Sequence, residues 1–163
     1  MSPSIIYDFQ KDASTTNWRV VDDGVMGGLS QGKLQVDDDG HGVYSGTVST
    51  ENNGGFSSLR YRFSTMEVSE NHSVVLRIKG DGKIYQFRVK DKVNQDHSYI
   101  YNFQTSGEWQ TIEIPLEEMY PTYRGRKLNI PNFKHSQIEE IAFLIGNKKA
   151  ESFELLIDKI ELK

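Results

Sequence analysis

The chain has 163 residues, 36% of them hydrophobic and 26% charged, which is the composition of a globular protein long enough to bury a core. Its formal net charge of -4 argues against a nucleic-acid-binding protein, because such proteins neutralise phosphates with an excess of Lys and Arg. There is no cysteine, so disulfides, Cys-ligated zinc and iron–sulfur clusters are excluded.

The N-terminal stretch MSPSIIYDFQKD lacks the basic segment and long apolar run of a signal peptide. No apolar stretch approaches the roughly 18 residues that suggest a membrane-spanning helix. We therefore expect a cytoplasmic protein that does not span a membrane. No linker or internal repeat divides the sequence, which predicts one domain over residues 1–163.

Short segments with alternating apolar and polar residues, bounded by Gly, Asn and Asp, recur along the whole chain. This pattern is typical of antiparallel sheets, and the 3.6-residue period of helices is nearly absent. The predicted strands are residues 4–9, 18–21, 33–36, 43–49, 57–63, 73–80, 83–90, 98–104, 110–116, 138–146 and 152–163. So many short strands predict an all-β fold, an antiparallel β-sandwich. Its core is expected to contain Trp18, Phe56, Phe87, Phe143 and Leu155.

Three connections between these strands are informative. KGDGK at residues 79–83 is predicted to close a hairpin and DDDGHG at residues 37–42 to form a turn, because Asp and Gly tolerate positive φ. DDDGHG lacks the Asp spacing and distal Glu of an EF-hand calcium loop. Residues 115–133 hold three of the four prolines, and they predict either a crossover between the sheets or a functional loop, with at most one helical turn.

The sequence contains none of the motifs of a serine hydrolase, a zinc protease or a P-loop enzyme. The four histidines are scattered and are expected to be surface residues. Paired carboxylates for glycoside hydrolysis could come from Asp22 or Asp23 with Glu51, but the sequence does not determine their separation. We therefore expect no catalytic residue, no cofactor and no bound metal.

Two glycine-rich segments lie close together in the sequence, DDGVMGGLS at 22–30 and ENNGGFSS at 51–58. Glycines permit close backbone approach, and Asp or Asn side chains can bond the backbone N–H groups that irregular loops expose. We therefore predict that the two loops lie together and hold each other, with Arg60 paired to Asp22 or Asp23.

The same loops could instead form a recognition site for a protein segment or a small ligand. A structural calcium ion near them is a weaker alternative. The candidate binding residues are Asp22, Asp23, Met26, Glu51, Asn52, Asn53, Phe56 and Arg60.

The pattern W-x-x-x-DDGVMGG-x-S over residues 18–30, followed by G-x-VS-x-ENNGGF-x-S-x-R over residues 46–60, closely resembles the complex I intermediate-associated protein family. YPTYRGRKL and the C-terminal stretch IEEIAFLIGNKKAESFELLIDKIEL are similar to the same family, so the resemblance covers nearly the whole chain. It implies a galactose-binding-like β-sandwich, a jelly-roll relative of carbohydrate-binding modules. It also implies a role in assembly, because mitochondrial members are chaperones for respiratory complex I and relatives are implicated in photosystem assembly.

Two functions remain as hypotheses. One is a non-catalytic, chaperone-like binding module or assembly factor, whose partners are proteins such as subunits of a respiratory or other membrane complex. The alternative is a carbohydrate-binding module or carbohydrate-active domain. A sugar binder should expose coplanar aromatic rings, for example Trp109, Tyr120 or Tyr123, whereas a protein binder should expose an apolar or mixed patch or an open sheet edge.

Overall fold

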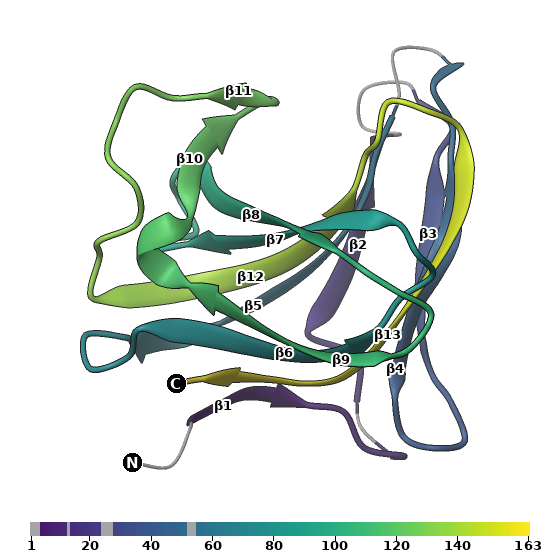
Figure 1. Ribbon diagram of the computed structural model, residues 1–163, viewed down its shortest axis with the longest axis horizontal. Coiled ribbons are helices and arrows are strands. Elements are labelled where there is room, and N and C mark those ends of the chain that lie inside the picture. Colours follow the sequence, from purple (N-terminus) through teal and green to yellow (C-terminus); the bar gives the residue numbers. More distant parts are fainter. Residues whose placement is uncertain (1–3, 13, 24–27, 52–54) are drawn as a thin grey trace.

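The computed structural model describes residues 4–12, 14–23, 28–51 and 55–163. Two antiparallel sheets lie face to face, which confirms the predicted β-sandwich (Figure 1). The six-stranded sheet consists of β1 (Ser4–Asp8), β3 (Gln31–Val36), β4 (Gly42–Val48), β6 (Ser73–Lys79), β9 (Trp109–Pro115) and β13 (Glu151–Leu162). The seven-stranded sheet consists of β2 (Trp18–Asp22), β5 (Ser57–Glu67), β7 (Ile84–Lys90), β8 (Ser98–Gln104), β10 (Tyr120–Tyr123), β11 (Arg126–Lys127) and β12 (Gln137–Ile145).

A long strand lies at the centre of each sheet. In the six-stranded sheet the order is β3-β4-β13-β6-β9, and β1 also pairs with β13. β4 pairs with β13 from Glu151 to Ile157 and β1 pairs with its last residues, so the two strands follow each other along β13. In the seven-stranded sheet the order is β11-β10-β8-β7-β12-β5-β2, which places β12 between β7 and β5.

The core lies between the sheets and is filled by every second residue of the strands. In β7, Tyr85, Phe87 and Val89 are buried, whereas the residues between them lie on the opposite face of the sheet. Of the predicted core residues, Trp18, Phe87, Phe143 and Leu155 are buried.

Phe56 is only partly buried, so its prediction as a core residue was wrong. It precedes β5, and the inward position at the start of this strand belongs to Ser57, which is fully buried. The hydroxyl of Tyr44 bonds the Oγ of Ser57 at 2.8 Å.

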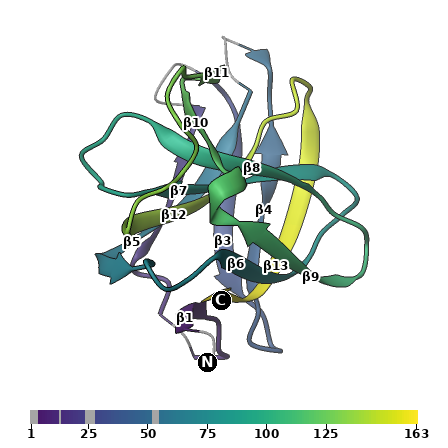
Figure 2. The same ribbon diagram turned by 60° about the vertical axis from the view of Figure 1, so that its left-hand side comes forward.

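The predicted strands are all present, with ends shifted by a few residues, and the segment from residue 115 to 133 contains more structure than predicted. It holds the short 3₁₀ helix η3 (Leu116–Glu118), which agrees with the predicted single helical turn, and the hairpin β10–β11, which the sequence pattern did not reveal. β9 belongs to the six-stranded sheet and β10 to the other, so this segment is a crossover along one side of the sandwich (Figure 2).

The predicted hairpin at residues 79–83 was wrong. β6 pairs with β9 and β13, whereas β7 pairs with β8 and β12, so this connection passes from one sheet to the other. Its turn chemistry was predicted correctly, since Gly82 has φ +85°. The second predicted turn is present between β3 and β4, where Gly40 has φ +84°.

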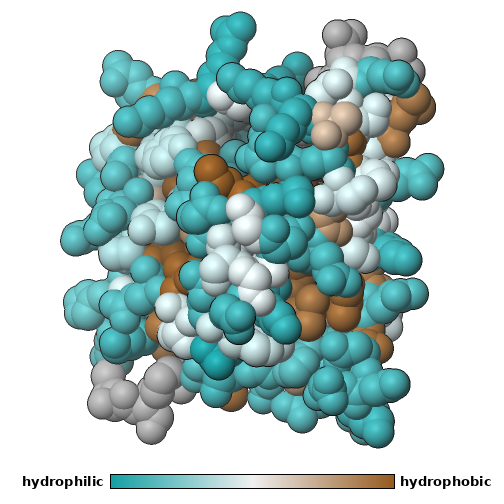
Figure 3. Space-filling view, turned by 45° about the vertical axis from the view of Figure 1, so that its right-hand side comes forward, coloured by the Kyte–Doolittle hydropathy of each residue, from teal (hydrophilic) through white to brown (hydrophobic). Residues whose placement is uncertain are grey.

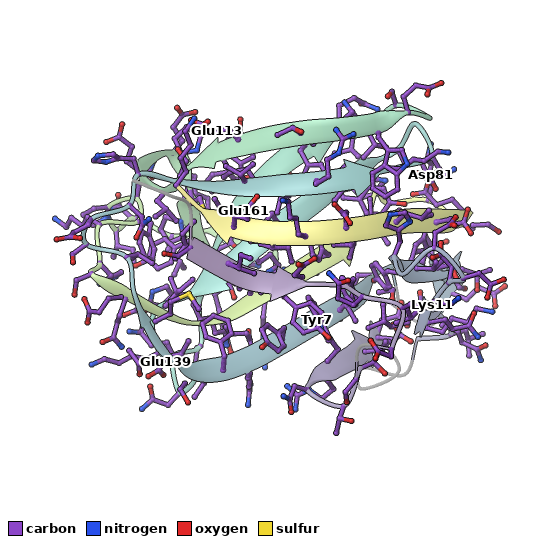
Figure 4. The ribbon with its side chains drawn as sticks, turned by 90° about the horizontal axis from the view of Figure 1, so that it is seen from below. Tyr7, Lys11, Asp81, Glu113, Glu139 and Glu161 are labelled. Carbon is purple, nitrogen blue, oxygen red and sulfur yellow. The ribbon has the colours of Figure 1, made fainter. Side chains whose placement is uncertain are left out.

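The crossover from β6 to β7 packs closely against Thr105. The Oγ1 of Thr105 donates to the carbonyl of Lys83 at 2.7 Å and accepts from the N–H of Gly82 at 3.1 Å. Beside it Asp81 accepts hydrogen bonds from Tyr85 and from the N–H of Glu154; it lies at one end of the view in Figure 4.

A methyl group on residue 80 would lie 2.2 Å from the Cβ of Thr105. We therefore expect Gly80→Ala to lower the free energy of unfolding by about 1–3 kcal/mol, measured by urea denaturation. Gly107→Ala is the control, because a Cβ there meets no atom within 4 Å, and its change should stay within about 0.5 kcal/mol. Equal losses in the two variants would contradict this account of the crossover.

Candidate functional site

The carboxylate of Asp23 joins the two glycine-rich segments. One oxygen, Oδ1, accepts a hydrogen bond from the N–H of Ser30 at 3.0 Å. The other, Oδ2, accepts from the N–H groups of Gly55 at 2.6 Å and Phe56 at 3.1 Å, and from the hydroxyl of Ser30. The N–H of Asp23 in turn donates to the carbonyl of Phe56 at 3.2 Å. The predicted contact between the segments is therefore present, and we call these four residues the loop clamp.

The loop clamp holds the buried negative charge of Asp23, which forms no salt bridge with a cation of the described residues. Asp23 is fully buried, and burial alone would raise the pKa of its carboxyl group. Hydrogen bonds from the Ser30 side chain and from the N–H groups of Gly55, Ser30 and Phe56 outweigh burial, so the pKa lies below its ordinary value. Asp23 is therefore ionised at neutral pH.

Residues next to the loop clamp also contact the local backbone or pack closely against the clamp. Asp22 accepts a hydrogen bond from the N–H of Gly32 at 2.9 Å. A Cβ on Gly28 would lie 2.3 Å from Oδ1 of Asp23, so only glycine permits this approach. The side chain of Glu51 is exposed. The remaining candidates, Met26, Asn52 and Asn53, lie outside the described residues.

The predicted pairing of Arg60 with Asp22 or Asp23 was wrong. Ser57 pairs with Asp22 across β5 and β2, so both side chains lie on the inner side of the sheet. Arg60 is three residues beyond Ser57, and the two-residue alternation of a strand places it on the outer face. Its Nε donates to the Oγ of Ser58 at 3.2 Å instead.

Arg60 belongs to a group of basic residues that the sequence reasoning missed. The outer face of the seven-stranded sheet carries, on β2, β5, β7 and β12, the residues Arg19, Arg60, Arg62, Arg88, Lys90, Glu140 and Ala142, which we call the basic face. The signal was present in the sequence, because Arg60 and Arg62, and likewise Arg88 and Lys90, are two positions apart and so share one side of a strand.

Glu140 is the one acid among the residues of the basic face, and it forms a salt bridge with only one of the cations. Its Oε1 accepts a hydrogen bond from the Nε of Arg62 at 2.7 Å. Lys90 donates to the carbonyl of Gln95 at 2.8 Å. Among the described residues Arg60 and Arg88 form no salt bridge, and the segments outside them contain no Asp or Glu. Arg88 is 3.5 Å from its nearest hydrogen-bonding oxygen, Oε1 of Gln86.

These two arginines are charged in a poorly solvated place. Burial and the neighbouring Arg60 lower the pKa of Arg88 to about 10, against the opposing effect of Glu140. Burial also lowers the pKa of Arg60, and repulsion from Arg19 and Arg62 adds to this effect while the charge of Glu140 opposes it. Both guanidinium groups still carry their charge at neutral pH. Among the described residues neither forms a salt bridge, although the charge of Glu140 in the neighbouring pairing row acts on both.

On the outer face of the six-stranded sheet, several charged side chains have partners close by. Figure 4 shows this face, with Glu113 and Glu161 on β9 and β13. Lys163 lies 2.8 Å from Glu113 and Lys159 lies 3.6 Å from Glu161. The guanidinium of Arg77 lies over the ring of Trp109 at 5.7 Å. Two acids of this sheet are therefore paired with lysines, whereas Arg77 contacts an aromatic ring.

The aromatic residues proposed for sugar stacking do not form one platform. Trp109 is on β9 of the six-stranded sheet, 4.6 Å from the ring of His41 and under Arg77. Tyr120 and Tyr123 are on β10 of the other sheet, three residues apart and so on opposite faces of the strand.

Two further polar clusters lie away from these sites. His135 lies 2.9 Å from the hydroxyl of Tyr99 and 3.6 Å from a carboxylate oxygen of Asp91. In the turn after β3, ligand atoms of Asp37, Asp39 and His41 lie within 4.8 Å of one another. Asp37 there accepts hydrogen bonds from the N–H groups of the other two, as a turn requires.

Replacing Asp23 by Ala would leave buried N–H groups of Ser30, Gly55 and Phe56 without an acceptor. We expect this variant to lose at least about 3 kcal/mol of unfolding free energy. That loss corresponds to roughly 6–12 °C in melting temperature for a chain of this size. Asp38→Ala, at an exposed turn position, is the control and should melt as the wild type does. A normal melting temperature for Asp23→Ala would mean that the clamp does not hold the loops.

The acid dependence of stability should carry the same signature. Because the pKa of Asp23 is lower in the folded protein, its contribution is present above the unfolded pKa of about 4 and is lost as pH falls through the folded value. Melting curves of the wild type and Asp23→Asn should therefore differ most at neutral pH and converge as the pH falls below about 4. A difference that is constant down to the lowest pH would contradict the assigned charge state.

Comparison with known proteins places these features in a family. The family model "Complex I intermediate-associated protein 30" matches residues 7–157. The Schizosaccharomyces pombe protein "Uncharacterized protein C9E9.15" is 31% identical over 168 residues, which cover 88% of this chain and 76% of that protein.

Several solved structures that resemble the chain are carbohydrate-binding modules, and two others are agarases of which the chain covers about a quarter. A family 11 module from Clostridium thermocellum, in complex with a β-1,3-1,4-mixed-linked tetrasaccharide, has a TM-score of 0.73 and 20% identity, covering 98% of this chain and 94% of its own. A family 30 module has a TM-score of 0.58 and 14% identity, covering 100% and 99%. At these identities the likeness concerns the fold alone, whereas the family match spans nearly the whole chain. The chain therefore belongs to the complex I intermediate-associated protein 30 family.

Proposed function

We propose that this chain is a non-catalytic binding module that holds a protein partner, in the manner of an assembly factor. The observation that carries the proposal is the basic face, where Arg60 and Arg88 are partly buried and form no salt bridge with a carboxylate of the described residues. Partly desolvated charges without a partner destabilise a fold, so their presence favours a role in binding an outside group.

The polar clusters give little support to catalysis. The cluster most like a catalytic one, Asp91 and His135, ends on the hydroxyl of Tyr99. Burial and the nearby charge of Asp91 raise the pKa of Tyr99 above its ordinary value, which makes the phenol a poorer nucleophile at neutral pH. We therefore expect no hydrolysis of esters, glycosides or nucleotides.

Hydrophobic contacts are not expected to dominate recognition. The large exposed hydrophobic side chains among the described residues are scattered over β1, β7, β10 and two connections: Ile5, Leu29, Ile84, Tyr123 and Ile130. On the face seen in Figure 3, hydrophobic residues form small patches with hydrophilic residues between them. Charge complementarity on the basic face is the better basis for specificity.

Carbohydrate binding is the second candidate, supported by the folds of the similar modules. It is the weaker one, because Trp109, Tyr120 and Tyr123 do not share a face. The ring of Tyr120 is moreover contacted by Lys127 at 5.5 Å and its hydroxyl by Asn102 at 2.9 Å. Within the described residues no helix is long and apolar enough to cross a membrane. Partner subunits from a membrane complex are a proposal that follows from the family resemblance, and the cytoplasmic location stays a prediction from the sequence.

Affinity capture from an extract of the source cells tests the proposal. We expect wild-type protein to retain a reproducible partner, identified by mass spectrometry, and the double variant Arg60→Gln/Arg88→Gln to lose it while melting normally. Arg77→Gln, on the other sheet, is the matched control and should retain the partner. Retention by the double variant, with loss in Glu51→Ala or Met26→Ala, would move recognition to the glycine-rich loops.

The sugar alternative needs its own measurement. We expect no retardation of the wild-type protein in gels containing mixed-linked β-1,3-1,4-glucan, the polymer class bound by the family 11 module. Retardation that Arg60→Gln/Arg88→Gln leaves unchanged, combined with failure to capture any protein, would replace the assembly-factor proposal by the carbohydrate-binding one.

A further inference from the structure

Side chains on the basic face are arranged in rows that run across three neighbouring strands. In one row Arg62 of β5 and Lys90 of β7 both pair with Glu140 of the central strand β12. This row therefore has an acid at its centre and a cation on each side. Glu140 is buried and accepts a hydrogen bond from Arg62, so the row contains its own counter-charge.

The next row also has a cation on each side, but it has no acid. Arg60 of β5 and Arg88 of β7 both pair with Ala142 of β12. This row lies two residues from the first on each strand, so its side chains lie on the same face of the sheet. It again has a cation on both sides, but its central side chain is a methyl group where the first row has a carboxylate. The row that follows, Ser58 and Gln86 around Leu144, is uncharged.

The geometry of this second row suits a single anionic group. Neighbouring strands are about 4.8 Å apart, so the Cα atoms of Arg60 and Arg88 are about 10 Å apart. The two arginine side chains flank β12 on either side of Ala142, and each reaches toward the next row, where Arg60 contacts Ser58 and Arg88 lies near Gln86. The charge of Arg60 and Arg88 is partly shielded from water, which strengthens an interaction with an anion placed between them.

We infer that a carboxylate side chain of an acidic segment in the partner protein binds over Ala142, between the guanidinium groups of Arg60 and Arg88. This inference rests on the proposed function and specifies the chemistry of its partner. The carboxylate takes the place that Glu140 occupies in the neighbouring row. It forms a hydrogen-bonded ion pair with each arginine, which arginine favours through its planar array of N–H donors.

The surroundings favour an acidic protein segment over a sugar or a nucleic acid. Arg19 extends the row on the edge strand β2, and Lys127 extends the positive charge on the other side of the face through its contact with Tyr120. An extended chain crossing the strands would therefore meet several cations, with Val21 and Leu144 as apolar neighbours. The net charge of -4 disfavours the multiple phosphate contacts of nucleic-acid binding.

The first experiment needs no ligand. Ala142→Glu supplies the missing carboxylate from within the protein, and Ala142→Gln is a control of the same size without the charge. We expect the Glu variant to melt at least about 2–4 °C above the Gln variant at pH 7, in low salt, and this difference to shrink in high salt. Equal melting temperatures, or a lower one for the Glu variant, would overturn the inference.

The second experiment measures binding to defined probes. A fluorescent ten-residue peptide of alternating Glu and Ala should bind the wild-type protein at least about tenfold more tightly than the same peptide with Gln in place of Glu. Arg60→Gln, Arg88→Gln and Ala142→Glu should each remove most of this difference, whereas Arg77→Gln should retain it. Equal affinity for the two peptides, or retention of the difference in all three face variants, would contradict the inference.

Competition decides the source of the carboxylate. We expect the Glu peptide to bind more tightly than an oligogalacturonate of similar charge and than inorganic phosphate. Tighter binding of the oligogalacturonate would assign the position to an acidic sugar, and tighter binding of phosphate to a phosphorylated ligand; either result overturns the peptide assignment. If capture from extract depends on Arg60 and Arg88 while the Glu peptide does not bind, this inference fails and the proposed function stands.

Discussion

The two-residue alternation of side chains in β12 and its neighbours is the constraint on which the rest of this structure depends. One set of positions, including Phe87 and Phe143, faces the other sheet and builds the core. The other set, including Arg60 and Arg88, is thereby placed on the outer face. Successive side chains of a strand point to opposite faces of the sheet. A core that fixes the inward residues therefore also fixes which residues form the basic face.

The loop clamp and the basic face differ in how their buried charges are stabilised. Asp23 is buried and stable because N–H and O–H donors of two loops surround its carboxylate. Arg60 and Arg88 are partly buried with few acceptors, and repulsion between neighbouring cations adds to the cost. The first arrangement stabilises the fold, whereas the second costs stability, which agrees with the proposed role of Arg60 and Arg88 in recognition.

The glycine-rich pattern, on which the resemblance to the family was recognised in the sequence, has a structural role in the described residues. Its described members, Asp23, Gly28, Ser30 and Gly55, hold one another in position, and a side chain on Gly28 would collide with Asp23. The pattern therefore reports how the ends of two strands are joined. The proposed recognition site lies instead on the basic face, to which these two loops contribute no residue.

The sequence by itself determined the strand segments, the all-β sandwich and most of the core, because alternation and turn residues are local properties. It also located the contact between the two loops, through glycines and acids close in sequence. Only the tertiary structure decided which strands pair: residues 79–83 read as a hairpin but connect different sheets, and Arg60 lies on the face opposite to Asp22. The row of Arg60, Ala142 and Arg88 joins residues far apart in the chain, so no local pattern could place an alanine between two arginines.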